Sequence, residues 1–360
     1  MSASEHSARR SRAASGLEER RLDALLVSSL ANIRYLTGFT GSNALVLLLP
    51  EKTVFFTDPR YGLQAAQESD CKVRVERGPL WRAAAQWIRS HGIRRLGVEK
   101  PHLSCETYLA LDDSLPAKAK LVPVADMVET LRMVKSRGEI ALIRRSVLAN
   151  SQAFAETLPR IRPGASELDL ATEIEYHMRK LGAEKPAFDT IVASGRRSAM
   201  PHASPTSRVL KSGEIVLIDM GAMRDGYASD MTRTLFLGRP SAKSRRLYQA
   251  VLEAQLAAID AVRAGVTAGD IDRAARRALR AEGLVRAFTH ATGHGLGLEI
   301  HELPKLHRKI TTRLETGMAI TIEPGVYLQG YGGIRIEDTV VVTRDGCEIL
   351  TPTPKRLLAL

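Results

Sequence analysis

The sequence predicts an α/β domain over residues 16–134, followed by an α+β domain over residues 135–360. Up to about Val128, short apolar strands alternate with helical patterns, which is typical of an α/β layer arrangement. The rest of the chain combines long helical patterns with Gly-rich strands, which is typical of helices set against a sheet. The segment before them, residues 1–15, is basic, rich in Ser and Ala and not followed by an apolar stretch. We expect a disordered tail there and no secretory signal.

Each element of the first domain follows from local composition. β-branched and aromatic runs bounded by turn residues predict strands at 24–27, 44–49, 53–57, 72–75, 96–99 and 120–124. Helical apolar spacing predicts helices at 59–68, 79–90 and 104–111. Residues 37–42 contain two glycines but lack the strand-to-helix context of a nucleotide-binding loop, so we interpret them as a turn.

A charged helical stretch over residues 128–158 contains the domain boundary, near Lys135. Gly138 is expected to interrupt this helix and Ser136 to cap its second part. A helix at 167–181 is expected to start behind Ser166 as its cap. Further helices are predicted at 243–263 and 268–282, and strands dominate residues 288–342.

Composition excludes several classes of protein. No apolar run approaches the roughly 20 residues that a membrane-spanning helix needs. The net charge of +12 is spread along the chain without a dense basic run, which argues against nucleic acid as a partner. Cys71, Cys105 and Cys347 are far apart, which favours a reducing cytoplasm over disulfides or a thiolate metal site.

The sequence from Ile215 to Thr234 predicts a β-hairpin, because Asp225-Gly226 is a strong turn signal between two strand-forming arms. A two-residue loop places Asp219 opposite Thr232 and Asp230 on the same face, with Cα atoms roughly 7–8 Å apart. Two carboxylates at that distance repel unless a cation lies between them. Either the hairpin is exposed and both acids are solvated, or a metal ion bridges them.

Further ligand-type residues occur near the C-terminal end. His290, His294 and His301 fall within twelve positions among glycines too dense for a helix, and the pattern is not the HExxH of zinc proteases. Glu323 and Glu337 fall in or next to otherwise apolar strands. Strand alternation places Arg335 on the same face as Glu337, and we expect the guanidinium to hold that carboxylate.

Asp219, Asp230, His294, Glu323 and Glu337 together form an oxygen-rich ligand set. Such a set favours manganese, with cobalt, iron or zinc as alternatives. Four negative charges match two divalent ions, and two-metal sites activate water and polarise a carbonyl group.

The motifs FDTIVASG…PHASPT, IDMGA…DGYASDMTRT, HATGHGLGLEIHE, TIEPGVY and GGIRIEDTVVVT occur in this order. In this respect the chain resembles the pita-bread metallopeptidases, and within them the Xaa-Pro peptidases prolidase and aminopeptidase P. The resemblance implies a creatinase-type, RNase H-like first domain and a pita-bread catalytic domain. It also implies a homodimer that hydrolyses di- or oligopeptides at the bond before proline.

The same resemblance implies roles for individual residues. It implies that two metals are bound by the five ligands named above, with Asp230 and Glu337 bridging. His202 and His301 would steady the substrate and the tetrahedral intermediate, and His290 would line the substrate pocket. Glu323 would shuttle a proton, and Arg335 would support the metal carboxylates.

One departure from the family pattern is the pair Arg196-Arg197, where relatives usually have small or amide residues. These arginines either bias the site towards acidic substrates or are solvated loop charges, and we favour the second interpretation. Methionine aminopeptidase, which uses the same ligands, is an alternative that the long first domain disfavours. A catalytically silent pita-bread binding protein is disfavoured because the ligand set is complete.

Overall fold

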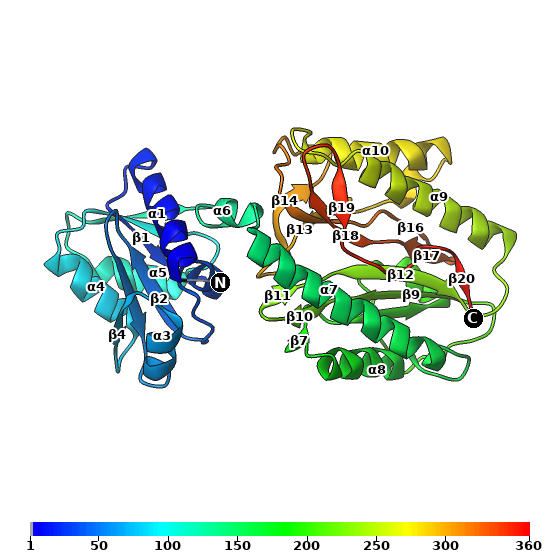
Figure 1. Ribbon diagram of the computed structural model, residues 1–360, viewed down its shortest axis with the longest axis horizontal. Helices are drawn as coiled ribbons and strands as arrows, with labels where there is room; N and C mark the ends of the chain where they lie inside the picture. The colour runs from blue at the N-terminus through cyan, green and yellow to red at the C-terminus, as the bar shows by residue number, and fades with distance from the viewer. Residues whose placement is uncertain (1–2) are drawn as a thin grey trace. The chain divides into compact units, whose positions relative to one another are not determined.

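The computed structural model describes residues 3–360 and divides into two compact units, the first ending at Arg132 and the second spanning Met133–Leu360 (Figure 1). In the first unit a six-stranded mixed sheet has the strand order β4-β3-β2-β1-β5-β6. Its strands match the predicted ones closely: β1 (Ala24–Val27), β2 (Ala44–Leu48), β3 (Thr53–Thr57), β4 (Lys72–Val75), β5 (Arg95–Glu99) and β6 (Lys120–Val124). The helices are α1 (Ala3–Glu19), α2 (Leu30–Thr37), α3 (Gly62–Glu68), α4 (Leu80–Ser90) and α5 (Cys105–Ser114).

The prediction of a disordered tail is wrong for the described part of residues 1–15, and residues 1–2 lie outside the described chain. Residues from Ala3 onward form helix α1, which buries Leu17 and whose arginine side chains donate to carbonyls at the C-terminal end of α2. Arg9 Nη1 donates to Tyr35 O at 3.2 Å, and Arg10 Nη1 donates to Leu36 O at 2.9 Å. The arginines that suggested a solvated tail therefore cap another helix.

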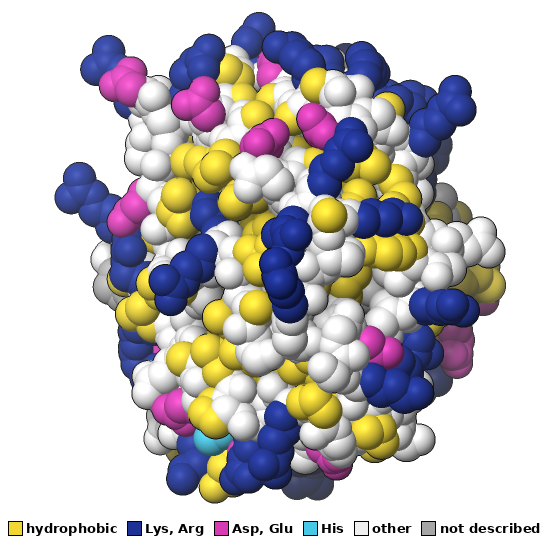
Figure 2. All heavy atoms as spheres, turned by 90° about the vertical axis from the view of Figure 1, so that its right-hand side faces the viewer, with side chains coloured by type: hydrophobic (Ala, Val, Ile, Leu, Met, Phe, Trp, Pro, Cys, Tyr) yellow, Lys and Arg dark blue, Asp and Glu magenta, His cyan; other side chains and the backbone are white. Residues whose placement is uncertain are grey.

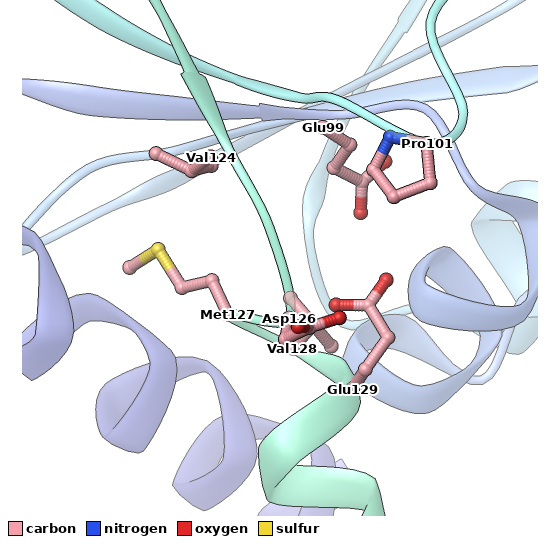
Figure 3. Close-up of a pocket in the computed structure, with 7 residues that line it drawn as sticks. All are labelled: Glu99, Pro101, Val124, Asp126, Met127, Val128 and Glu129. Carbon is pink, nitrogen blue, oxygen red and sulfur yellow. The ribbon is translucent and has the colours of Figure 1, made fainter. Parts of the chain in front are cut away.

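A buried carboxylate at the end of β5 organises the end of the first unit. Glu99 accepts hydrogen bonds from Ser28 N and Ser29 N, and Asn32 Nδ2 donates to both Glu99 and Glu129. Figure 3 shows Glu99 and Glu129 on opposite sides of a small pocket that Pro101, Val124 and Met127 also line. Burial raises the pKa of Glu99. Because both Glu99 oxygens accept hydrogen bonds from the protein, we interpret this carboxylate as structural.

The second unit carries helices α7 (Arg137–Thr157), α8 (Glu167–Lys180), α9 (Ala242–Asp260) and α10 (Ala268–Ala281). The expected interruption at Gly138 is wrong: Gly138 lies in the first turn of α7, and the break falls between α6 (Glu129–Met133) and α7. Ser136 and Ser166 cap α7 and α8 as predicted, and in each case the carboxylate three residues on accepts a reciprocal hydrogen bond from the serine backbone N–H. A strong capping box therefore outweighs the cost of the glycine.

Two sheets of this unit bring the candidate site together. One has the order β20-β12-β9-β8 and the other β14-β13-β15-β18-β19. The strands are β8 (Ile191–Ser194), β9 (Ile215–Met220), β12 (Met231–Phe236), β13 (Gly293–Gly295), β14 (Glu302–Leu306), β15 (Ala319–Ile322), β18 (Asp338–Val342), β19 (Cys347–Ile349) and β20 (Leu358–Ala359). Shorter pairings involve β7 (Lys185–Pro186), β10 (Ala222–Arg224), β11 (Tyr227–Ala228), β16 (Gly325–Leu328) and β17 (Gly332–Arg335).

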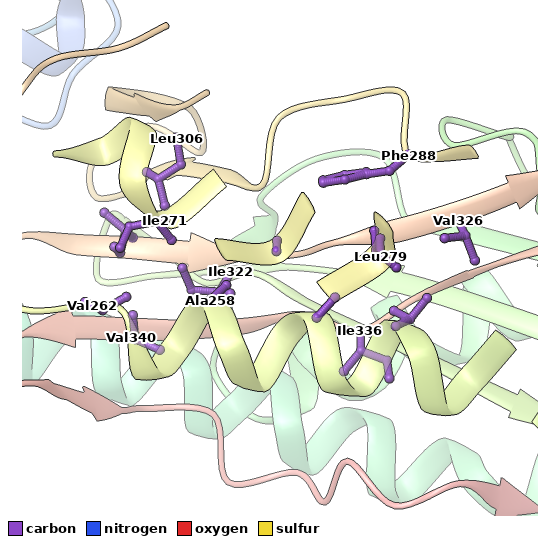
Figure 4. Close-up of a cluster of buried hydrophobic side chains, with 14 of the residues drawn as sticks. Ala258, Val262, Ile271, Leu279, Phe288, Leu306, Ile322, Val326, Ile336 and Val340 are labelled. Atoms are coloured by element: carbon purple, nitrogen blue, oxygen red, sulfur yellow. The ribbon is translucent and has the colours of Figure 1, made fainter. Parts of the chain in front are cut away.

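Each helix pair covers its own hydrophobic core. The pair α9–α10 packs on β15, β18 and their neighbours through a cluster that includes Ile271, Leu279 and Val340 (Figure 4). The pair α7–α8 packs on β8, β9 and β12 through a second cluster that includes Ile174 and Ile218. Between the two sheets, Glu337 N donates to Thr232 O and Thr339 Oγ1 donates to Asp230 O. These bonds fix β12 beside the segment that carries Glu337.

The surface agrees with the prediction that positive charge is spread along the chain rather than concentrated in one run. On the face drawn in Figure 2, Lys and Arg side chains are separated by uncharged and hydrophobic groups rather than gathered into one patch. Within residues 3–360, none of the helices combines the length and the apolar character that crossing a membrane requires.

Candidate metal centre

The hairpin that carries the two aspartates has the predicted register. Arg224 pairs with Tyr227 and Asp219 pairs with Thr232. Asp225 and Gly226 have φ values of 52° and 73°, as a tight two-residue turn of this type requires. The alternative of an exposed hairpin is wrong, because the relative exposures of Asp219 and Asp230 are only 9% and 5%.

The five predicted ligands converge from distant parts of the second unit. Asp219 lies on β9, Asp230 precedes β12, His294 lies on β13, Glu323 follows β15 and Glu337 precedes β18. His294 Nε2 lies 3.6 Å from Asp230 Oδ2 and 3.5 Å from Glu323 Oε1. One ligand atom each of Asp230, His294 and Glu337 lies within 4.8 Å of the others.

The cluster contains more buried negative charge than the protein itself neutralises. Asp219 Oδ1, Asp230 Oδ1 and Glu337 Oε1 are buried without a hydrogen-bond partner, although buried polar atoms are nearly always paired. Unpaired buried carboxylates are costly unless they coordinate a cation. Carboxylate oxygens and an imidazole nitrogen are suitable ligands for divalent ions, so these residues fit a metal centre.

The ionisation of these groups agrees with that fit. Burial and then the neighbouring carboxylates raise the pKa of Asp230 and of Glu337 well above the usual range. Burial raises the pKa of Glu323 to about 8. Burial lowers the pKa of His294 to about 4, which keeps the imidazole neutral and able to coordinate. In the absence of a cation the carboxyl groups hold protons that a bound cation would displace.

The expectation that the Arg335 guanidinium bonds directly to the Glu337 carboxylate is wrong. Arg335 Nη2 donates to Asp219 Oδ2 at 2.6 Å, and its Nε donates to Thr232 Oγ1 at 3.0 Å. Thr232 Oγ1 in turn lies 2.7 Å from Glu337 Oε2, to which it donates. Strand β17 ends at Arg335, and the guanidinium reaches across to the hairpin, so its hydrogen-bonded link to Glu337 runs through the Thr232 hydroxyl.

A hydrogen-bonded chain of fixed direction leads from Arg335 to His290. Arg335 Nη1 lies 2.6 Å from Tyr327 OH, and Tyr327 OH lies 2.8 Å from His290 Nε2. Because a guanidinium only donates, Tyr327 OH accepts from Arg335. The Ala291 carbonyl only accepts, so the ring proton of neutral His290 is on Nδ1, which is 2.8 Å from Ala291 O, and Tyr327 OH donates to the unprotonated Nε2. Burial lowers the pKa of His290 to about 4, in agreement with a neutral ring.

The two remaining candidate histidines, His301 and His202, occupy different places. The His301 ring contacts the His294 ring edge to face, with centroids 4.5 Å apart, and His301 is exposed. His202 is also exposed, and together with His290 it lines an open pocket of about 730 Å³. His290 Nδ1 lies 4.0 Å from Glu323 Oε2, so this pocket adjoins the carboxylate cluster.

Buried carboxylates on two helices hold the loops that carry these histidines, and neither carboxylate was predicted from the sequence. On α10, Asp272 Oδ1 accepts from Thr292 N and Thr292 Oγ1, while Arg276 donates to the carbonyls of Phe288 and His290. At the start of α8, Glu167 accepts from Ser194, Arg197 and Thr206. Tyr327, two residues after Pro324-Gly325, was also missed, although its place after the Glu323 strand was a usable signal.

Comparison with known proteins agrees with this geometry. Residues 141–344 match the metallopeptidase family M24, and residues 9–134 match the creatinase/prolidase N-terminal domain. The chain belongs to metallopeptidase family M24. An Xaa-Pro dipeptidase of Pyrococcus horikoshii is 35% identical to this M24 peptidase over 95% of this chain and 96% of its own.

Two solved structures are similar along almost their whole length. An Xaa-Pro dipeptidase from Bacillus anthracis has a TM-score of 0.96 and 38% identity, covering 99% of this chain and 100% of its own. An X-Pro aminopeptidase from Thermotoga maritima has a TM-score of 0.88 and 38% identity, covering 95% of this chain and 99% of its own. The predicted fold, a creatinase-type domain followed by a pita-bread catalytic domain, is therefore confirmed, as is the prediction of a metallo-exopeptidase.

Proposed function

We propose that this M24 peptidase hydrolyses the peptide bond before proline, using two divalent ions held by Asp219, Asp230, His294, Glu323 and Glu337. The observation that carries the proposal is the set of buried carboxylate oxygens that lack partners beside a neutral His294. The similar proteins named as Xaa-Pro dipeptidase and X-Pro aminopeptidase support the choice of substrate class. Manganese is the ion we expect, and the assignment of Asp230 and Glu337 as bridging ligands is part of the proposal.

Divalent ions bound there would polarise the scissile carbonyl and make a bound water acidic enough to react near neutral pH. The protein supplies the other steps. Glu323, whose carboxylate lies 3.5 Å from His294 Nε2 and 4.0 Å from His290 Nδ1, is placed between the cluster and the open pocket and is suited to take up a proton and to pass it to the leaving proline nitrogen. His202 and His301, both exposed next to the cluster, would donate to the developing oxyanion and the substrate.

Arg335 and His290 have supporting roles in this proposal. Arg335 holds Asp219 directly and Glu337 through Thr232, which orients both carboxylates. His290 has its Nδ1 near Ala291 O and its Nε2 near Tyr327 OH. With both nitrogens engaged, the His290 ring is suited to forming a fixed wall of the substrate pocket rather than to transferring protons.

Substrate preference tests the proposed function. Proline has no N–H and a fixed φ, so a pocket that packs against the ring gains from its rigidity. We expect Ala-Pro to be cleaved at least about a hundredfold better than Ala-Ala in kcat/KM, near the upper range for apolar discrimination. The measurement uses manganese-loaded protein, with Met-Ala-Ser as the comparison substrate. Comparable values for Met-Ala-Ser and Ala-Pro would assign the protein to the methionine aminopeptidase alternative, and no hydrolysis at all would favour a silent binding protein.

His202 provides a separate test of catalysis without loss of metal. We expect His202→Ala to lower the turnover of Ala-Pro by on the order of 10²–10³, the usual cost of one preorganised donor. The metal content by elemental analysis should stay at the wild-type value, because His202 is not among the five ligands. His307→Ala is a matched control outside the pocket lining. Wild-type turnover in the His202 variant would show that its assigned role is wrong.

A homodimer and a cytoplasmic location, both expected from the sequence, stay predictions for this M24 peptidase, as does the absence of a nucleic-acid partner.

A further inference from the structure

The two adjacent arginines of the short helix η2 (Gly195–Ala199) differ in their surroundings. Arg196 is exposed, as the interpretation of a solvated loop charge requires. Arg197 is only 28% exposed at its side chain, and it lines the open pocket shared by His202 and His290. The interpretation as a solvated charge is therefore wrong for Arg197.

Arg197 is held in place by Glu167, whose carboxylate oxygens already accept several hydrogen bonds from the protein. Its Nε donates to Glu167 Oε2 at 3.1 Å and its Nη2 donates to Ser204 O at 2.6 Å. Glu167 is completely buried and also accepts from the backbone N–H and hydroxyl groups of Ser194 and Thr206. The guanidinium is thus anchored on one side, and the donors on Nη1 remain for a ligand in the pocket.

The pocket has a mixed lining without an acidic residue. Its lining residues are Arg197, Met200, Pro201, His202, Ala203, Ser204, Thr206, Thr289 and His290. The apolar members can pack against a ring, while the anchored guanidinium offers a fixed charge that matches a carboxylate in geometry. An ammonium group would find no counter-charge among these residues and would be repelled by Arg197.

This charge distribution orients a substrate. A free Xaa-Pro dipeptide has an ammonium group on the residue before the scissile bond and a carboxylate on the proline after it. We propose that Arg197 binds the free carboxylate of that proline, so that the enzyme favours dipeptides over longer or C-terminally blocked peptides. This inference rests on the proposed function, because it presumes cleavage before proline.

The test compares Ala-Pro with Ala-Pro amide, which differ only in the carboxylate. Losing a hydrogen bond to a charged group costs about 10–100-fold. We expect wild-type protein to prefer Ala-Pro over the amide by about that factor. In Arg197→Gln, kcat/KM for Ala-Pro should fall by a similar factor, mainly through KM, while the amide changes less than about threefold. Arg197→Lys should recover part of the loss for Ala-Pro, and Arg196→Gln is the matched control that should leave both substrates unchanged.

Each result has a distinct meaning. Equal losses for both substrates in Arg197→Gln would show that Arg197 only holds its loop, and would overturn the inference while leaving the proposed function intact. Equal wild-type rates for the dipeptide and its amide would also overturn the inference, and this comparison does not depend on a variant that folds correctly. Wild-type protein that cleaves neither substrate would refute the proposed function and, with it, this inference.

Discussion

Asp230→Asn should lower the turnover of Ala-Pro by on the order of 10³ or more. Bound metal ions contribute several kcal/mol of transition-state stabilisation, and about 1.4 kcal/mol corresponds to a factor of ten. Asp230 is buried, its Oδ1 has no partner within the protein, and its Oδ2 lies 3.6 Å from His294 Nε2. An amide retains the shape of the side chain but loses the negative charge and one of the two oxygens that could coordinate a cation, which would abolish the proposed bridging role.

The measurement combines kinetics with elemental analysis after manganese loading. We expect about two metal ions per wild-type chain, because the proposed ligand set holds a two-metal site, and fewer in Asp230→Asn. Asp225→Asn is a matched control on the same hairpin, because Asn tolerates the positive φ of 52° at the turn and lies outside the ligand cluster. An Asp230→Asn protein with wild-type metal content and turnover would refute the metal assignment, as would full activity in chelator-treated wild-type protein.

The metal-free protein should lose stability between pH 6.5 and 8. Burial raises the pKa of Glu323 from 4.5 to about 8, and the pKa values of Asp230 and Glu337 also rise. Over this window the unfolded chain has ionised these groups while the folded chain still holds protons, so the free energy of unfolding falls as the pH rises. Over 1.5 pH units the fall that Glu323 contributes is on the order of 2 kcal/mol.

The pH window starts at 6.5 because, below that pH, the buried histidines change the free energy of unfolding in the opposite direction. Burial lowers the pKa values of His290 and His294 to about 4, so their contribution increases stability with pH only up to the unfolded value of 6.5. Denaturant unfolding in the presence of chelator measures the slope above that value. With manganese the slope should reverse, since ionised carboxylates bind the cation. Glu323→Gln should reduce the slope of the metal-free protein, and a flat or rising slope in wild type would contradict the ionisation described above.

Local chemistry was enough to predict much of the catalytic unit. The turn at Asp225-Gly226 determines the register of its hairpin, so the pairing of Asp219 with Thr232 could be predicted without a structure. Carboxylates in apolar strands are unusual enough that Glu323 and Glu337 were also recognised as candidates. The capping serines of α7 and α8 were predictable because capping acts within three residues.

Contacts between distant segments could not be predicted in this way. Arg335 and Asp219 are 116 positions apart, and alternation along one strand says which face a side chain takes but not which neighbour it meets. The same limit applies to Tyr327 and His290 and to the buried acids on α8 and α10. Helix α1 was missed because its arginines bind carbonyls of another helix, which composition does not reveal.

The two buried helix carboxylates, Glu167 on α8 and Asp272 on α10, give the pocket a modular construction. Glu167 secures the segment around Ser204 and Thr206, next to His202, whereas Asp272 secures Thr292 close to His290. Each wall thus depends on its own helix pair and hydrophobic core. Sequence change in one wall can alter which substrates fit while the opposite wall keeps its shape, so new specificities can evolve in this scaffold without rebuilding the acid cluster.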